Sequence, residues 1–181
     1  KGNRIYKSRV LTFEPFTYKE IDNVIKLIQE NLTPDLLKGL KKVMYPEDKN
    51  KVKYYGHCYH SSQALYHLID TKDLVSVSAK DYRDEKHWWL QDFHKGKIYD
   101  VTGEQYFSVG QKPPYSMGKE TKWYGWQERP QQISLNLMTR VLKDRLVKDE
   151  IINYKEIKCY TIRKEYSGKK TEKKMLKILT R

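Results

Sequence analysis

A cysteine placed where a helix is expected to begin is the feature that most constrains this chain. Residues 56–65 read Gly-His-Cys-Tyr-His-Ser-Ser-Gln-Ala-Leu, a pattern in which an extended approach runs into a helix at Cys58. The N-terminus of a helix carries partial positive charge and stabilises a thiolate. Cys58 is therefore a candidate nucleophile, and the residues that follow it show whether a partner is available.

A histidine and an aspartate follow on two predicted strands. Residues 87–93 and 97–101 have the best strand patterns in the chain, and Gly96 between them suits the tight turn of an antiparallel hairpin. The hairpin brings His87 and Asp100 onto neighbouring strands. An imidazole can take the proton of a thiol, and a carboxylate can orient that imidazole. The candidate catalytic residues are Cys58 as nucleophile, His87 as general base and acid, and Asp100 as the orienting group.

These residues resemble the transglutaminase-like branch of the papain-like cysteine enzymes. In that group a Gly-x-Cys element starts a helix, a His-x-Trp strand follows, and a further strand ends in Asp-x-Thr. This chain has Gly56-His57-Cys58, His87-Trp88-Trp89 and Asp100-Val101-Thr102, with spacings of 29 and 13 residues between the three candidates. The resemblance covers residues 54–102. It departs from the family at Tyr59, where transglutaminases commonly have tryptophan.

The resemblance implies an α+β fold in which the cysteine-bearing helix packs on an antiparallel sheet, the papain-like or transglutaminase-like core. It also implies acyl transfer through a thioester, either hydrolysis of an amide or ester or transfer to an amine, with an acyl compound as substrate and no cofactor. The backbone N–H of Cys58 and a side chain of Tyr54 or Gln63 are candidate donors to an oxyanion. Further candidate substrate-binding residues are Trp88, Trp123 and Trp126.

The rest of the chain fits one domain over residues 1–163 and a basic tail over 164–181. Thr17 is a candidate cap for a helix with apolar residues up to Ile28, and Thr33-Pro34 opens a second short helix. The pattern predicts further elements as follows: a strand at 74–79, a long loop at 103–130, a helix at 133–147, a strand at 156–162 and a short basic helix at 171–179.

Metal binding is the competing use of the histidine-rich segment. His57, Cys58, His60 and His87 are all ligand types, but the chain has no Cys-x-x-Cys and no His-Glu-x-x-His motif. We therefore expect no metal, with His57 and His60 at the rim of the cleft. Cys159 shares a predicted strand face with Ile157 and Thr161, which favours a structural role.

The positive charge of the chain indicates an anionic partner. The net charge is +13, and residues 139–181 hold 14 of the 36 Lys and Arg but only 6 of the 23 Asp and Glu. Such a field favours nucleic acid or an acidic protein. Candidate nucleic-acid-binding residues are Lys169, Lys170, Lys173 and Lys174. The alternative function is thus a non-catalytic, basic nucleic-acid-binding or interaction protein built on the same scaffold.

The chain shows no segment that would place it in a membrane. No apolar run approaches the length needed to span a bilayer, and no secretory signal pattern is visible. Two cysteines do not make a disulfide framework, so we expect a reduced, cytoplasmic setting.

If the C-terminal lysines contact nucleic acid, binding should weaken steeply as salt rises, because each neutralised phosphate releases counterions. Replacing Lys169, Lys170, Lys173 and Lys174 together by glutamine should flatten the salt dependence of binding to single-stranded DNA. The measurement is a fluorescence-anisotropy titration at several salt concentrations. Absence of retention on heparin at about 50 mM salt would show that these lysines are only a solvated face.

Overall fold

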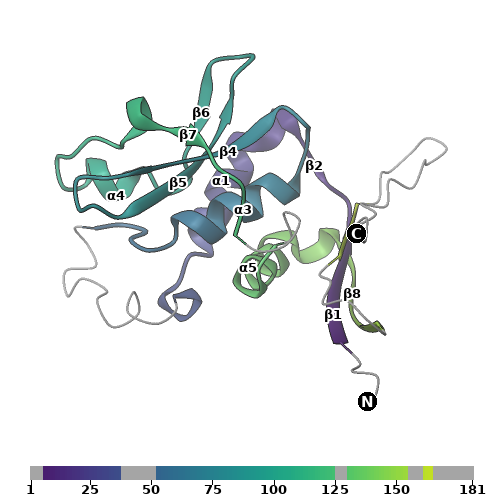
Figure 1. Cartoon of the computed structure of the whole chain (residues 1–181). Helices are drawn as coiled ribbons and strands as arrows, with labels where there is room; N and C mark the ends of the chain where they lie inside the picture. The colour runs from purple at the N-terminus through teal and green to yellow at the C-terminus, as the bar shows by residue number, and fades with distance from the viewer. Residues whose placement is uncertain (1–5, 38–51, 125–129, 155–160, 165–181) are drawn as a thin grey trace, which may run out of the picture.

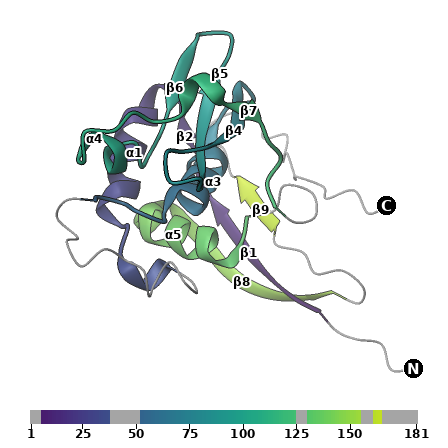
Figure 2. The same cartoon turned by 60° about the vertical axis from the view of Figure 1, so that its left-hand side comes forward.

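Two sheets lie on opposite sides of a layer of helices (Figure 1, Figure 2). The computed structural model describes residues 6–37, 52–124, 130–154 and 161–164. The larger sheet has the order β6-β5-β4-β7 and is antiparallel throughout; its strands are β4 Leu74–Lys80, β5 Lys86–Asp92, β6 Lys97–Tyr99 and β7 Lys119–Glu120. The smaller sheet has the order β8-β1-β9, made by β1 Tyr6–Phe13, β8 Leu146–Tyr154 and β9 Thr161–Lys164.

The longer helices of the described residues lie between the two sheets (Figure 1, Figure 2). The longer ones are α1 Ile21–Glu30, α3 Cys58–Leu68 and α5 Gln132–Leu142, and α4 is the short Glu104–Phe107. Helix α3 packs on β4 and β5 on one side and on α5 on the other, and α5 in turn contacts β1. A two-strand parallel pair, β2 Phe16–Thr17 with β3 Ile69–Asp70, closes the end of α3. The mixed α+β class is therefore confirmed.

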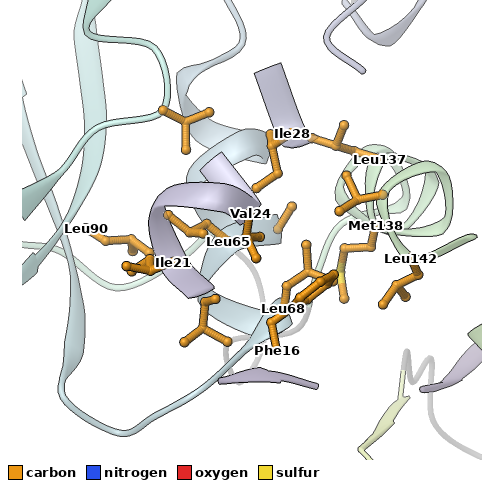
Figure 3. Close-up of a cluster of buried hydrophobic side chains, with 14 of the residues drawn as sticks. Phe16, Ile21, Val24, Ile28, Leu65, Leu68, Leu90, Leu137, Met138 and Leu142 are labelled. Atoms are coloured by element: carbon orange, nitrogen blue, oxygen red, sulfur yellow. The ribbon is translucent and has the colours of Figure 1, made fainter. Parts of the chain in front are cut away.

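The core forms where α1, α3 and α5 meet (Figure 3). Val24 and Ile28 of α1 and Leu65 and Leu68 of α3 are all fully buried, and Met138 of α5 lies against them. The first helix begins as predicted: before its 3-10 turn, the Thr17 N–H donates to Glu20 Oε2 at 2.7 Å. This packing fixes α3 along its length and leaves its first residue, Cys58, at the edge of the core.

Two of the expected elements are shorter or differently built. The helix predicted at 133–147 ends at Leu142, because Lys143 adopts a φ of 44° and Leu146 begins β8. The segment after Thr33 forms only a 3-10 turn, Pro34–Leu36, and the chain is already extended at Leu37.

The expected loop at 103–130 contains short elements. It holds α4, a 3-10 turn at Tyr115–Met117 and the edge strand β7. Strand β7 extends the sheet beside β4, whereas Tyr106 of α4 and Tyr115 of the 3-10 turn pack on the face of β5 that carries His87. The long loop is thus part of the wall around the histidine.

Some predicted features lie outside the described residues or were missed. The strand expected at 156–162 is described only as β9, and the helix at 171–179 with the four candidate lysines, Lys169, Lys170, Lys173 and Lys174, lies outside the described residues. Strand β1 was not predicted, although it is the central strand of its sheet. None of the helices in the described part of the chain combines the length and apolar character that a bilayer-spanning segment needs.

Gly118 supports the buried face of the larger sheet. A Cβ atom there would lie 2.4 Å from Cζ2 of Trp89 and 2.8 Å from Cγ1 of Val77, so an alanine must push the indole aside. We expect Gly118→Ala to lower the free energy of unfolding by about 1–3 kcal/mol, the usual effect of overpacking. Urea denaturation measures it, with the exposed Ser116→Ala of the same turn as the control. Equal stability of the two variants would contradict this packing.

Candidate active site

A loop with unusual backbone angles delivers Cys58 to the start of α3. Tyr54 has a φ of 62° and Gly56 a φ of 81°, and the His57 N–H donates to the Tyr54 carbonyl at 3.1 Å. The tight turn needs the conformational freedom of glycine at position 56. The N–H groups of the first helical turn lack partners within a helix, so the half-exposed Cys58 lies beside free backbone donors.

Strand β5 presents His87 to this end of α3. Alternation along the strand places His87 and Trp89 on one face, while Trp88 and Leu90 join the core on the other. The Ser62 hydroxyl donates to the Trp88 carbonyl at 3.1 Å and so pins α3 to the strand. The Cys58 thiol lies 3.8 Å from the carbonyl oxygen of Lys86, directly before the histidine.

Asp100 holds the imidazole from the neighbouring strand. His87 Nε2 lies 2.7 Å from Asp100 Oδ2, and the two side chains are 1% and 3% exposed. The same carboxylate accepts a hydrogen bond from the Tyr115 hydroxyl at 2.9 Å, and its Oδ1 accepts from the Thr102 N–H at 3.0 Å. These donors fix the carboxylate, and the carboxylate in turn fixes the ring of His87.

The electrostatic setting favours a protonated His87. Burial opposes the charge, but hydrogen bonding to Asp100 and to the Cys58 thiol outweighs burial and raises the pKa of His87 to about 10. An imidazole charged at neutral pH stabilises a thiolate beside it. His87 therefore interacts electrostatically with both Asp100 and Cys58.

Gln105 closes the far side of the imidazole. Its side-chain nitrogen lies 3.5 Å from His87 Nδ1 and donates to the carbonyl and hydroxyl oxygens of Thr102, each at 3.1 Å. Its oxygen accepts from Arg83 Nη2 at 3.0 Å. Gln105 therefore connects the Nδ1 side of the imidazole to Thr102 and Arg83.

The site opens into a cavity of about 350 Å³. One wall is formed by the rings of Tyr59, Trp88 and Tyr124, with Tyr59 stacked on Tyr124 at 5.1 Å between centroids. The other wall is polar and consists of the following residues, grouped around the β4–β5 turn and α4: Asp81, Arg83, Glu85, Lys86, Gln105 and Tyr106. A substrate that reaches Cys58 meets both a flat apolar surface and a set of charges.

The predicted aromatic contacts are only partly at the cavity. Trp88 lines it, whereas Trp123 is 4% exposed and stacks on Trp88 at 5.4 Å between centroids. Trp123, a candidate substrate-binding residue, is thus a buried packing partner of Trp88 and not part of the cavity lining, because its indole gains more by packing behind Trp88 than it does in water. Trp126 lies outside the described residues.

The two predicted oxyanion donors are not among the residues that line the cavity. Gln63 is fully buried, and its oxygen accepts from the Gln131 N–H at 2.9 Å and from the Ser134 hydroxyl at 2.6 Å. It therefore links α3 to the start of α5. Tyr54 contributes to the turn before the helix, where burial raises the pKa of its phenol. The structure does not bring either side chain to the cavity.

His57 and His60 are buried rather than at the rim. They are 1% and 6% exposed, with His57 Nδ1 3.0 Å from His60 Nε2. Burial lowers the pKa of His57 to about 4, so the ring is neutral where His87 is charged. No three His, Cys, Asp or Glu side chains of the described residues are grouped in a way that could hold a metal ion. Cys159 lies outside these residues.

Several residues of the site were not found by sequence reasoning. Tyr115 follows Pro113-Pro114 in what reads as a loop, and its distance from Asp100 in the chain gives no sign of their contact. Asp81 and Arg83 sit in a charged turn between strands, where such residues are common. Only Gln105 carried a signal, since it follows the Asp-x-Thr element and precedes an aromatic residue.

No known protein family, curated protein or solved structure matches the chain. The function is therefore inferred from the residues of the site alone.

The charge of His87 should be visible by NMR and in the stability of the protein. Its folded pKa of about 10 exceeds the ordinary value of 6.5, so its contribution to stability is complete below about pH 6.5 and is lost as pH rises through about 10. Asp100→Asn should lower the pKa of His87 and flatten this loss between pH 6.5 and 10. Histidine side-chain NMR and urea denaturation measure the two effects.

His57 provides an internal control in the same spectra. Its pKa of about 4 predicts a neutral ring at pH 6.5, and Asp100→Asn should leave it unchanged. A His87 resonance that titrates near its ordinary value in the wild-type protein would contradict the buried ion pair.

Proposed function

We propose that the protein is a thiol-dependent acyl-transfer enzyme. In this proposal Cys58 is the nucleophile, His87 exchanges protons with the thiol and the leaving group, and Asp100 orients the imidazole. The observation that carries the proposal is that the buried imidazole bonded to Asp100 through Nε2 and the half-exposed Cys58 thiol line one cavity, with the thiol 3.8 Å from the carbonyl oxygen of the residue before His87. Thiolate, imidazolium and carboxylate in this order are the parts that covalent catalysis by cysteine requires.

The order of these residues also supports a papain-like or transglutaminase-like core as the proposed fold family. The nucleophile is the first residue of α3, His87 lies on β5, and Asp100 directly follows β6. The helix packs on an antiparallel sheet, which is the arrangement that the resemblance implies. Fold-level similarity by itself does not fix chemistry, so the reaction is argued from the site.

The first half of the reaction forms a thioester. The Cys58 thiolate attacks the carbonyl carbon of an amide or ester, and the negative charge that moves to the carbonyl oxygen is stabilised by N–H groups of the first turn of α3. The tetrahedral species then collapses. The bond to the leaving amine or alcohol breaks, and the leaving group takes the proton of His87.

The second half releases the acyl group. Neutral His87 takes a proton from a water molecule or an amine as that nucleophile attacks the thioester carbonyl. The carbon–sulfur bond breaks, and the thiolate and imidazolium are restored. Asp100 orients the ring throughout and stabilises its positive charge each time it forms.

Alkylation of Cys58 by iodoacetamide at about pH 6 should depend on His87, because an imidazolium beside a thiol favours the reactive thiolate. We expect His87→Gln to slow alkylation of Cys58 at this pH by roughly tenfold or more, since most of an ordinary thiol is protonated there. Glutamine is chosen because its amide can still donate to the buried Asp100. Peptide mapping by mass spectrometry separates Cys58 from Cys159.

A substitution of the nucleophile separates reactivity from stability. Cys58→Ser nearly conserves volume and should leave the free energy of unfolding within about 1 kcal/mol of wild type, while any acyl transfer is abolished. If Cys58 reacts at the same rate with and without the His87 imidazole, the proposed relay is wrong. An unfolded Cys58→Ser variant would instead indicate a structural cysteine.

A further inference from the structure

Lys86 is a charged residue of the cavity wall for which the described residues provide no carboxylate partner. It is exposed at the start of β5, and its Nζ lies 4.9 Å from the ring centroid of Trp88 and 5.2 Å from that of Tyr124. These rings keep the ammonium group over the aromatic wall of the cavity. Its own carbonyl oxygen is 3.8 Å from the Cys58 thiol, so the residue lies next to the nucleophile.

The neighbouring lysine is in a different situation. Lys80 is directly opposite Lys86 in the β4–β5 register, but its Nζ pairs with Asp84 Oδ1 at 2.8 Å and it does not line the cavity. The two lysines carry the same charge and lie on adjacent strands. Only Lys86 is left to bind a ligand, and Lys80 is a matched control.

The acidic groups of the same wall are already engaged away from Lys86. Asp81 accepts from Arg83 Nη2 at 2.7 Å and from the Tyr106 hydroxyl at 2.9 Å, and Glu85 accepts from the Tyr55 hydroxyl at 2.9 Å. Burial raises the pKa of Asp81, but these hydrogen bonds outweigh burial and lower it, so Asp81 stays ionised and bound to Arg83. The carboxylates therefore do not neutralise Lys86.

Arg83 adds a second donor to this wall. Its Nε and Nη2 are bound to Asp81 and Gln105, and the rings of Tyr55 and Tyr82 lie 4.9 Å and 5.0 Å from its guanidinium carbon. None of the described residues accepts a hydrogen bond from Nη1, so that nitrogen keeps its N–H groups for a ligand.

We propose that the cavity selects an acyl donor that carries a carboxylate near the reacting carbonyl, with Lys86 as the residue that recognises this charge. The carbon chain of the donor packs on Tyr59, Trp88 and Tyr124, and Arg83 Nη1 provides a further hydrogen bond. The inference rests on the acyl-transfer function proposed above and names its substrate class. Lys86 acts on binding of the substrate, whereas Cys58 and His87 act on its carbonyl.

Two alkylating reagents of nearly equal size test the charge preference. Iodoacetate and iodoacetamide both alkylate the Cys58 thiolate: a carbon–sulfur bond forms and iodide leaves. The two reagents differ in one negative charge. We expect Lys86→Gln to lower the iodoacetate-to-iodoacetamide rate ratio at Cys58 by roughly three- to tenfold, the effect of one partly exposed charge. Lys80→Gln should leave the ratio unchanged, and Lys86→Arg should restore it.

The outcomes separate this inference from the function on which it rests. If Cys58 reacts with iodoacetamide in a His87-dependent way but the ratio is the same in Lys86→Gln and wild type, the acyl-transfer proposal stands and the anionic substrate is wrong. If Lys80→Gln lowers the ratio equally, the effect is net charge and recognition by Lys86 is also wrong. If Cys58 is unreactive toward iodoacetamide, the proposed function itself fails.

Discussion

The buried pair of His87 and Asp100 is the interaction on which the site depends. Removing two charges from water costs several kcal/mol for each ion, and the direct bond offsets this only when other donors complete the arrangement. Tyr115 and Thr102 are those donors, and they come from segments after β6. The loop that follows Asp100 is therefore held in place by the carboxylate, just as the carboxylate is held by the loop.

Strand register determines whether this pair can form at all. Leu90 is opposite Tyr99, so Asp100 follows on the same face as Trp89 and His87. A shift of one residue would turn Asp100 to the core face and leave the imidazole without its partner. The core residues on either side of Asp100, Tyr99 and Val101, resist that shift because it would carry them out of the core. Packing on the core face of the sheet thus keeps His87 and Asp100 paired on the opposite face.

The parts of this molecule that were predictable are those with a local cause. The helix start at Cys58, the hairpin at Gly96 and the order of Cys58, His87 and Asp100 all follow from short patterns. Leu146 shows the limit: its spacing from Leu142 fits a helix, but the positive φ at Lys143 ends the helix between them. Trp123 reads as a loop residue and is buried because the rings of Tyr59, Tyr66 and Trp88 pack against it. Contacts of this kind depend on distant segments, and so no local pattern records them.

The two ends of α3 explain how one helix can serve both stability and reactivity. Its last turns contribute Leu65 and Leu68 to the core, where truncation of a leucine costs about 2–5 kcal/mol. Its first turn packs Tyr59 against the core and holds the half-exposed Cys58 at the cavity, beside the N–H groups of the helix N-terminus. A change at Cys58 therefore acts on the chemistry, and the buried end of α3 keeps the helix in place. A change at Lys86, on β5, acts on substrate binding. Because Leu65 and Leu68 hold α3 in the core, residues of the cavity wall can determine substrate preference without holding the helix in place.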